Sequence, residues 1–182
     1  MLKKIIYQNQ KNVKEDVSIL LVEAFPENER PPVEVFFKNL ELRRDYSSLL
    51  AFYDDEKFIG FSSLIFYEDV CYIFFLAVSP TYRHQGYGGQ MLEIIKKDYA
   101  SYILLLAFEE VNPQYDNYIE RKNRQAFYSH HGFKDNELIT DEWGVRFQTA
   151  YIGRRQVSYQ EYQEIFKIGF GEWTIKHLKK AN

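Results

Sequence analysis

Apolar residues recur at helical spacing in the first quarter of the chain. Across residues 13–25 they stand three or four positions apart, which predicts an amphipathic helix that ends near Pro26. The residues before it, Lys3–Tyr7, predict a short strand. Prolines at 31–32 open a second apolar stripe over residues 33–40, which predicts a second helix.

The pattern then changes to aromatic and β-branched runs. Ser48–Tyr53, Phe58–Tyr67 and Val70–Val78 are such runs, and only short polar breaks separate them. Breaks this short predict consecutive antiparallel strands. Tyr102–Phe108 is almost unbroken in its apolar character, as expected of a strand buried on both faces. The other predicted elements are a helix through Met91–Tyr99, a helix over Tyr118–His131, and a strand pair over Phe133–Thr140 and Val145–Ile152.

Polar residues at the ends of these stretches predict helix caps. Asn12, with Glu15 three residues later, predicts a capped start of the first helix. Ser158 and Glu161 have the same spacing ahead of a C-terminal helix. Gly132 is suited to a left-handed cap at the end of the helix before it.

The organisation along the chain predicts one mixed α/β domain with a helical tail. The chain has 182 residues, which fits one domain, and it shows no repeats, linkers or low-complexity segments. The apolar stripe of the tail runs from Tyr162 to Trp173 and could cover a pocket, pack on the sheet, or join a homodimer. We expect Lys176, Lys179 and Lys180 in the last helical turns, where they complement the helix dipole.

Charge and composition exclude several classes of function. The net charge is −3, with no basic excess or basic patch, so we expect no nucleic-acid partner. Cys71 is the one cysteine, and His130 and His131 are adjacent, so neither predicts a metal site. No targeting peptide is apparent, and no apolar run approaches the roughly 20 residues that a membrane-spanning helix needs. We therefore expect a cytoplasmic protein that does not associate with a membrane.

A glycine cluster between a strand and a helix carries the candidate chemistry. An apolar strand ends at Val78, a proline turn follows, and three glycines (86, 88 and 89) lead into an amphipathic helix. Backbone N–H groups at a helix start attract anions, and glycines let a bulky anion come close. The segment therefore predicts a phosphate or pyrophosphate site, with Arg83 adding a fixed charge.

Other phosphate motifs fit this segment poorly. A P-loop needs Gly-x4-Gly-Lys-Ser/Thr, which does not occur here. A dinucleotide fingerprint needs a third glycine where the chain has Met91, and also a parallel strand–helix–strand unit. A glycine turn that merely caps the helix remains the alternative.

Two motifs give the sequence a family resemblance. Residues 83–88, Arg-His-Gln-Gly-Tyr-Gly, have the pattern Arg/Gln-x-x-Gly-x-Gly/Ala, and residues 127–133 have Phe-Tyr-x-x-x-Gly-Phe. With the element order above, the chain resembles the GNAT superfamily of acyl-CoA-dependent N-acyltransferases over residues 2 to 152. The resemblance implies a splayed, mostly antiparallel sheet flanked by helices in residues 1–152. Residues 153–182 would then be a helical extension of the same domain.

The same resemblance implies acetyl-CoA as the acyl donor, and no metal. The backbone from Gln85 to Gly89 would bind the coenzyme A pyrophosphate, and the strand backbone at Leu76–Val78 would pair with the pantetheine arm. The family often has Asn and a small residue where this chain has Arg121 and Arg124, so no coenzyme contact is assigned there. The implied coenzyme-binding residues are Leu76, Ala77, Val78, Arg83, His84, Gln85, Gly86, Tyr87, Gly88 and Gly89.

By the same resemblance, Tyr128 is the expected general acid for the leaving thiolate, since a phenol can supply that proton. Many relatives have a glutamate base where this chain has Tyr72. Glu109 and Glu110, at the end of a predicted strand, are the substitute candidates, and a water chain without a single base is equally compatible.

The acceptor side is less constrained. In the GNAT fold the loop between the first two helices borders the acceptor pocket, and here Glu27 and Glu29 in that loop could attract a cationic amine. We therefore expect an N-acetyltransferase for a primary amine of a small molecule or peptide. The alternatives are a coenzyme-A-binding protein without turnover and a generic anion-binding interaction module.

Overall fold

The computed structural model describes residues 1–181, apart from the side chain of Asn28. The chain forms two compact units, of which unit 1 comprises Met1–Ile65 with Ile73–Asp98. Unit 2 comprises Phe66–Tyr72 with the residues from Tyr99 onward, so strands β3 and β4 contribute to both units.

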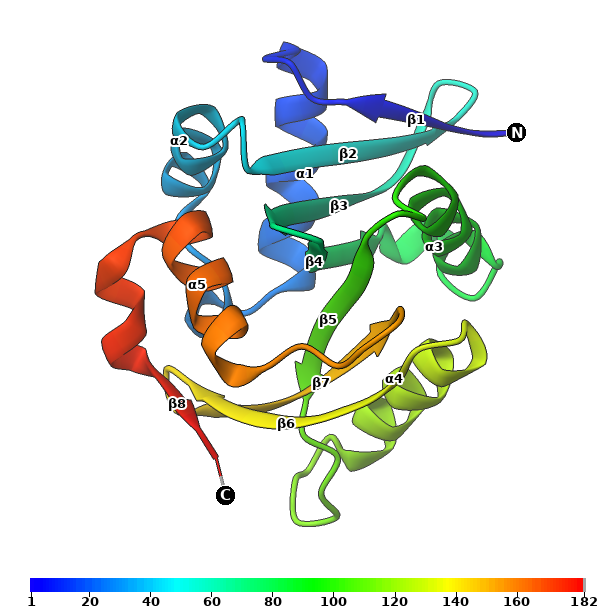
Figure 1. The fold of residues 1–182 in the computed structure, drawn as a ribbon. Helices are drawn as coiled ribbons and strands as arrows, with labels where there is room; N and C mark the ends of the chain where they lie inside the picture. The colour runs from blue at the N-terminus through cyan, green and yellow to red at the C-terminus, as the bar shows by residue number, and fades with distance from the viewer. Residues whose placement is uncertain (182) are drawn as a thin grey trace. The chain divides into compact units, whose positions relative to one another are not determined.

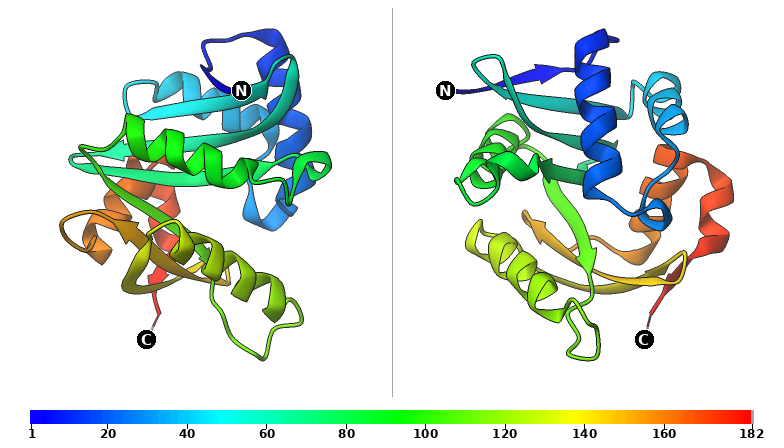
Figure 2. Two further views of the ribbon diagram at one scale, coloured as in Figure 1. Left: turned by 90° about the vertical axis from the view of Figure 1, so that its right-hand side faces the viewer. Right: turned by 180° about the vertical axis from the view of Figure 1, so that it is seen from behind.

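Unit 1 is a layer of strands with helices on both faces (Figures 1 and 2). Its strand order is β1-β2-β3-β4, and β1/β2 and β2/β3 pair antiparallel. The elements are β1 (Leu2–Ile6), α1 (Lys11–Ala24), η1 (Glu27–Glu29), α2 (Val33–Leu42), β2 (Ser47–Asp54), β3 (Lys57–Tyr67), β4 (Val70–Val78), η2 (Pro80–Tyr82) and α3 (Tyr87–Asp98).

The core of unit 1 lies between α1, α2 and one face of the strands. The apolar stripe that predicts α1 is the stripe that is buried, including Val17 and Leu21. Phe36 and Phe37 of α2 join it, and Phe36 and Phe75 have their ring centroids 5.9 Å apart. Helix α3 lies on the opposite side of the strands from α1 (Figure 2). The strands of unit 1 are therefore covered by helices on both faces.

One glycine brings β3 and β4 unusually close. A Cβ built on Gly60 would lie 2.1 Å from the carbonyl oxygen of Ala77 and 3.1 Å from Cα of Val78. The next backbone contact, from the N–H of Ser79 to the carbonyl of Ile59, is 2.8 Å long. The end of β4 can therefore lie this close to β3 only because residue 60 is a glycine.

In unit 2, α4 and α5 lie on opposite sides of its strands (Figures 1 and 2). Its strand order is β5-β7-β6-β8, and the pairs β5/β7, β6/β7 and β6/β8 are antiparallel. The elements are β5 (Ile103–Glu109), α4 (Tyr118–His130), β6 (Lys134–Glu142), β7 (Val145–Ile152), α5 (Tyr159–Phe170), η3 (Glu172–His177) and β8 (Leu178–Lys180). A mixed α/β fold with a mostly antiparallel sheet and flanking helices, as predicted, is confirmed.

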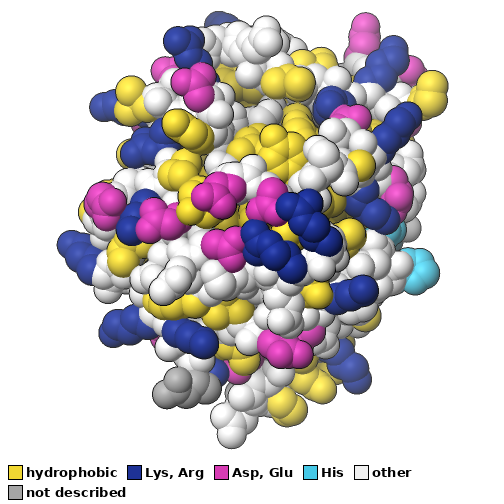
Figure 3. Space-filling view, viewed as in Figure 1, with side chains coloured by type: hydrophobic (Ala, Val, Ile, Leu, Met, Phe, Trp, Pro, Cys, Tyr) yellow, Lys and Arg dark blue, Asp and Glu magenta, His cyan; other side chains and the backbone are white. Residues whose placement is uncertain are grey.

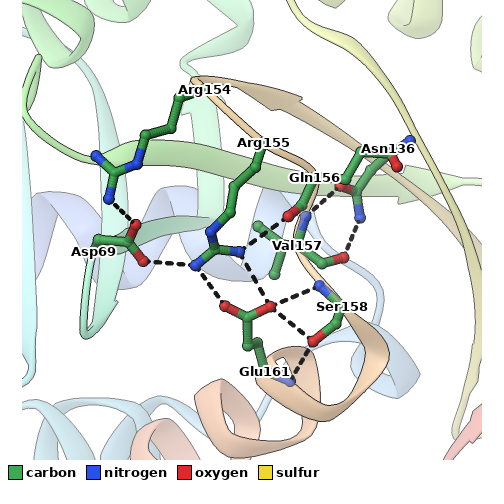
Figure 4. Close-up of polar contacts among 8 residues, drawn as sticks. All are labelled: Asp69, Asn136, Arg154, Arg155, Gln156, Val157, Ser158 and Glu161. Carbon is green, nitrogen blue, oxygen red and sulfur yellow. Dashed lines mark hydrogen bonds and ion pairs between the residues drawn. The ribbon is translucent and has the colours of Figure 1, made fainter.

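The start of α5 is held by a polar network (Figure 4). Ser158 and Glu161 form the predicted capping box, and Arg155 bridges Glu161 and Asp69 at 2.7 and 2.8 Å. The buried amide of Asn136 accepts from the N–H of Val157 at 2.8 Å and donates to its carbonyl at 2.9 Å. The tail helix thus packs on its own unit, and its residues Tyr162, Ile165 and Phe166 are buried there.

Two end effects differ from prediction. Helix α1 begins at Lys11 without a side-chain cap, so the predicted cap at Asn12 is wrong. The side chain of Gln10 instead accepts from the N–H of Gln8 at 2.6 Å. The last lysines, Lys179 and Lys180, lie in a strand rather than in a helix, because β6 has an open edge that β8 can pair with.

We expect Gly60→Ala to lower the free energy of unfolding by about 1–3 kcal/mol, because the new methyl group overlaps a backbone carbonyl that cannot move aside. Denaturant unfolding measures the loss. Lys57→Ala, at an exposed position of the same strand, is the control and should be nearly neutral. Equal stability of the Gly60→Ala and wild-type proteins would contradict the close approach.

Candidate functional site

The turn from β4 to α3 contains the glycine cluster. After η2 the chain passes through two left-handed positions, His84 at φ +60° and Gly86 at φ +81°. Helix α3 starts immediately afterwards, and the N–H of Gln90 donates to the carbonyl of Gly86 at 3.1 Å. The predicted turn between a strand and a helix start is present.

Side chains of the turn hold its own backbone in place. Nε of Arg83 donates to the carbonyl of Val78 at 3.1 Å, and the amide of Gln85 donates to the carbonyl of Thr81 at 2.9 Å. The hydroxyl of Tyr87 donates to Asp54 at 2.8 Å, and this hydrogen bond raises the pKa of Tyr87. The turn is therefore anchored to the end of β4 and to the end of β2.

The backbone of this turn suits a diphosphate. The first N–H groups of a helix, here from Tyr87 onward, have no partner within the helix and carry partial positive charge. Gly86 is exposed, and a Cβ built on it would meet nothing within 4 Å. The side chains of Arg83, His84 and Gln85 are exposed on the same turn. The main chain at Gly86 is thus open to solvent at the start of α3, and its assignment to a pyrophosphate stays a prediction.

The strand end beside the turn has mixed burial. Leu76 and Val78 are half-buried, while Ala77 is buried with its carbonyl against Gly60. Their assignment to a pantetheine arm stays a prediction.

The predicted acceptor residues lie in the turn η1 of unit 1. Glu27 is exposed and Glu29 is half-buried. The turn is tied to the end of α1 by Nε of Arg30, which donates to the carbonyl of Phe25 at 3.0 Å. Their role toward an amine stays a prediction.

In unit 2, Glu109 ends β5 as a buried carboxylate between two arginines. Its oxygens lie 2.9 Å from Arg121 and 2.6 Å from Arg124. The guanidinium of Arg121 also stacks 3.8 Å from the ring centroid of Tyr115. Arg121 and Arg124, which stand where the family often has Asn and a small residue, therefore form ion pairs with the candidate base Glu109.

Glu110 is the other candidate base, and it pairs with Arg146 of β7 at 2.9 Å. To accept a proton, Glu109 or Glu110 would first have to give up an ion pair with arginine. The catalytic role of Glu109 and Glu110 stays a prediction, and their ion pairs with arginine count against it.

Tyr128 of α4 lies against an aromatic cluster. Its ring centroid is 5.6 Å from that of Phe108, 5.8 Å from that of Phe133 and 5.4 Å from that of Phe127. Burial raises the pKa of Tyr128, and the charge of Arg124 opposes this rise. The hydroxyl therefore stays protonated at neutral pH, as a proton donor requires.

A buried polar chain in unit 2 escaped the sequence analysis. The hydroxyls of Tyr72 and Tyr162 are 2.9 Å apart, and the hydroxyl of Tyr162 donates to Glu142 at 2.7 Å. Thr140 donates to the same carboxylate oxygen at 2.7 Å. The sequence does contain a signal for the burial of two of these residues. Side chains in a strand alternate between its faces, so counting from Leu138 places Thr140 and Glu142 on the buried face.

Among residues 1–181 no three His, Cys, Asp or Glu side chains are grouped closely enough to hold a metal ion. No helix in the described part of the chain is long and apolar enough to cross a membrane. On the face drawn in Figure 3, basic and acidic side chains are interspersed.

Comparison with known proteins gives a consistent result. The acetyltransferase (GNAT) domain family matches residues 45–135 of this chain, which span both sequence motifs. No similar sequence was found among curated proteins.

Several solved structures share the fold. A GNAT-family protein from Bacteroides thetaiotaomicron has a TM-score of 0.72 at 21% identity, covering 94% of this chain and 98% of its own. An aminoglycoside 6'-N-acetyltransferase complexed with coenzyme A has a TM-score of 0.66 at 18% identity, covering 86% and 99%. The ribosomal-protein-S18-alanine N-acetyltransferase from Escherichia coli has a TM-score of 0.63 at 16% identity, covering 86% and 97%.

We expect the stability of the protein to fall with rising pH because of Glu142. Burial raises the pKa of this carboxyl from 4.5 to about 7. The stabilising contribution of the neutral acid is complete below about pH 4.5 and is lost as the pH rises through 7. The free energy of unfolding should drop by about 3 kcal/mol from this group between pH 5 and pH 8.

Denaturant unfolding at pH 5, 6, 7 and 8 measures this drop. Glu142→Gln keeps an oxygen that accepts from Thr140 and Tyr162 but cannot ionise, so its unfolding free energy should depend much less on pH. A variant with the same slope as the wild-type protein would refute the assignment.

Proposed function

Because this chain belongs to the acetyltransferase (GNAT) family, we propose that it transfers an acetyl group from acetyl-CoA to a primary amine of a small molecule or peptide. The observation that carries the proposal is the open backbone at Gly86 and the start of α3, a turn that suits a diphosphate. The structural neighbour with bound coenzyme A supports this choice of ligand.

The coenzyme would be held mainly by main-chain groups. The backbone of Gln85–Gly89 would bind the pyrophosphate, with Arg83 and His84 adding side-chain charge and hydrogen bonds. The backbone of Leu76–Val78 would pair with the pantetheine arm, and an N–H near Val78 would polarise the carbonyl to be attacked. Acetyl-CoA supplies an activated thioester when bound.

The proton chemistry would fall to unit 2. Tyr128 would donate a proton to the departing sulfur, since its hydroxyl remains protonated at neutral pH. Glu109 and Glu110 are the candidate bases from sequence, each now found in an ion pair with arginine. Glu27 and Glu29 would attract the cationic acceptor.

A coenzyme-A-binding protein without turnover is the second candidate. The two ion-paired glutamates favour it, because no carboxylate predicted to act as base is available without breaking a contact. Release of free thiol from acetyl-CoA across a panel of amines separates the two functions. A third reading, a generic anion-binding module, requires that acetyl-CoA bind no better than inorganic pyrophosphate.

Gly86→Asp should weaken acetyl-CoA binding about 100-fold, because it sets a carboxylate against the bound diphosphate. Isothermal titration calorimetry measures the affinity. Gly144→Asp is a matched control, since Gly144 also has a left-handed φ (+84°) and open space around its Cβ position. Unchanged affinity in Gly86→Asp, or an equal loss in both variants, would exclude the turn as the coenzyme site.

Tyr128→Phe should lower kcat for thiol release by about 10²–10³-fold and leave the affinity for acetyl-CoA within about twofold. Steady-state kinetics and calorimetry on the same preparation measure both. Tyr118→Phe, on the same helix, serves as the control for loss of a hydroxyl. Parallel losses of kcat and affinity in Tyr128→Phe would indicate a packing role instead.

A further inference from the structure

Tyr87, the first residue of α3, links the start of this helix to the end of a neighbouring strand. Its hydroxyl donates to Oδ2 of Asp54 at 2.8 Å. Its ring meets the ring of Tyr82 edge to face, with centroids 6.0 Å apart. The half-buried side chain of Tyr87 therefore contacts both η2 and the end of β2.

Asp54 is a charged acceptor at a fixed place in the sheet. It is the last residue of β2 and pairs with Lys57 across the tight turn at residues 55–56. Its other oxygen, Oδ1, accepts from the amino group of Met1 at 2.6 Å. The hydrogen bonds from Met1 and from Tyr87 lower the pKa of Asp54, so the acceptor is a carboxylate at neutral pH. A hydrogen bond to a carboxylate is stronger than one between neutral groups.

The first turn of α3 has little helical preference of its own. Gly88 and Gly89 follow Tyr87 directly, and glycine is among the poorest helix formers. The first N–H groups of a helix also have no partner within it. The N–H of Gln90, which donates to the carbonyl of Gly86 at 3.1 Å, closes this turn. The hydrogen bond from Tyr87 to the sheet therefore stabilises a turn that tends to fray.

The opposite end of α3 is held by a separate contact. Nζ of Lys4 in β1 forms an ion pair with Asp98, the last residue of α3. Lys4 itself is opposite Phe52 of β2 in the sheet. Both contacts lie within unit 1, and that of Tyr87 is at the end of the helix that adjoins the glycine turn. The two ends of α3 can therefore be loosened one at a time.

The charge of Asp54 by itself disfavours an anion at this turn. Asp54 and Asp55 both act on Tyr87 as negative neighbours, and a bound diphosphate would be repelled by them. A carboxylate one hydrogen bond away from a proposed diphosphate site therefore needs a compensating role. The hydrogen bond that Asp54 accepts from the first residue of the helix provides one.

On the premise that the proposed coenzyme binding is correct, we propose that Tyr87 and Asp54 are positioning residues for the diphosphate of acetyl-CoA. The hydroxyl of Tyr87 acts through its own backbone, because it holds the N–H groups of Tyr87, Gly88 and Gly89 in the orientation that diphosphate oxygens require. The free protein then already has the turn in its bound form, which lowers the entropic cost of binding.

Isothermal titration calorimetry with acetyl-CoA, and separately with inorganic pyrophosphate, tests this role. Tyr87→Phe should weaken the binding of both ligands about 10-fold, because it removes only the hydroxyl that donates to Asp54. Asp54→Ala should weaken both to a similar extent, although it removes a negative charge near an anion. Asp54→Asn keeps an oxygen that accepts, so its affinities should stay within about threefold of those of the wild-type protein.

The sign of the effect in Asp54→Ala separates positioning from simple charge repulsion. If Asp54 acted only through its charge, its removal would strengthen the binding of both anions. Tighter binding in Asp54→Ala than in the wild-type protein would therefore overturn the proposal. In the double variant of Tyr87→Phe and Asp54→Ala, the loss should be no larger than in either single variant, because both remove the same hydrogen bond.

Lys4→Met is the matched control at the far end of α3. It removes an ion pair of the same helix and should keep the affinity for both ligands within about twofold. An equal loss in Lys4→Met and Tyr87→Phe would indicate general loosening of the helix and exclude a specific role of Tyr87. In steady-state kinetics with one accepted amine, Tyr87→Phe should raise KM for acetyl-CoA and leave kcat within about twofold.

Amide hydrogen exchange of the free protein gives a readout that needs no ligand. The amide of Gln90 should exchange about 10-fold faster in Tyr87→Phe than in the wild-type protein, because its hydrogen bond to Gly86 opens more often. In Lys4→Met the same amide should exchange at the wild-type rate. Unchanged exchange of Gln90 in Tyr87→Phe would contradict the stabilising effect of the hydroxyl.

The failure of this proposal and the failure of the proposed function give different results. If the wild-type protein binds acetyl-CoA and Tyr87→Phe binds it equally well, the positioning role is wrong and the proposed function stands. If the wild-type protein binds neither acetyl-CoA nor pyrophosphate, the proposed function is wrong and the positioning role falls with it, whatever the exchange rate of Gln90.

Discussion

The account depends on one stretch of backbone, the reversal between the end of β4 and the start of α3. Two left-handed residues, His84 and Gly86, turn the chain so that a helix begins directly after them. Nε of Arg83 donates a hydrogen bond to the carbonyl of Val78 and so holds the turn against the end of the strand. On the neighbouring strand β3, Gly60 has no side chain, so the carbonyl of Ala77 can approach its backbone closely. A helix start fixed in this manner presents N–H groups that need an acceptor, and an anion with several oxygens provides one.

Three glutamates of unit 2 show how surroundings decide what a carboxyl can do. Glu109 is buried between Arg121 and Arg124, and Glu110 pairs with Arg146. Both are compensated by cations, which is what a buried or half-buried carboxylate needs to persist. Glu142 has hydroxyl partners instead, and burial raises its pKa to about 7. The residue type and the unit are the same in the three cases, but the partners are arginines for two of them and hydroxyls for the third.

Much of the fold could be predicted from local patterns, because strands β2 to β4 and helices α1, α2 and α5 follow the apolar periodicity of their own residues, and α5 also begins at its predicted capping box. The glycine turn was predictable for the same reason. Features that depend on a partner distant in the sequence could not be found that way. The need for Gly60 comes from Ala77 on another strand, and the strand at Lys179–Lys180 exists because β6 offers it an edge. Tyr72 and Glu142 are seventy residues apart in the sequence, and only the tertiary structure links them, through hydrogen bonds to Tyr162.

The most direct test of the central claim is to observe the backbone of the turn while the coenzyme binds. In ¹H–¹⁵N NMR spectra of the wild-type protein, addition of acetyl-CoA should shift the amide signals of Gln85–Gly89 strongly, with downfield movements typical of new hydrogen bonds to phosphate oxygens. Inorganic pyrophosphate alone should move the same amides in the same direction, with weaker affinity. Tight binding of acetyl-CoA that leaves these five amides unmoved would contradict the account, since the diphosphate would then lie elsewhere.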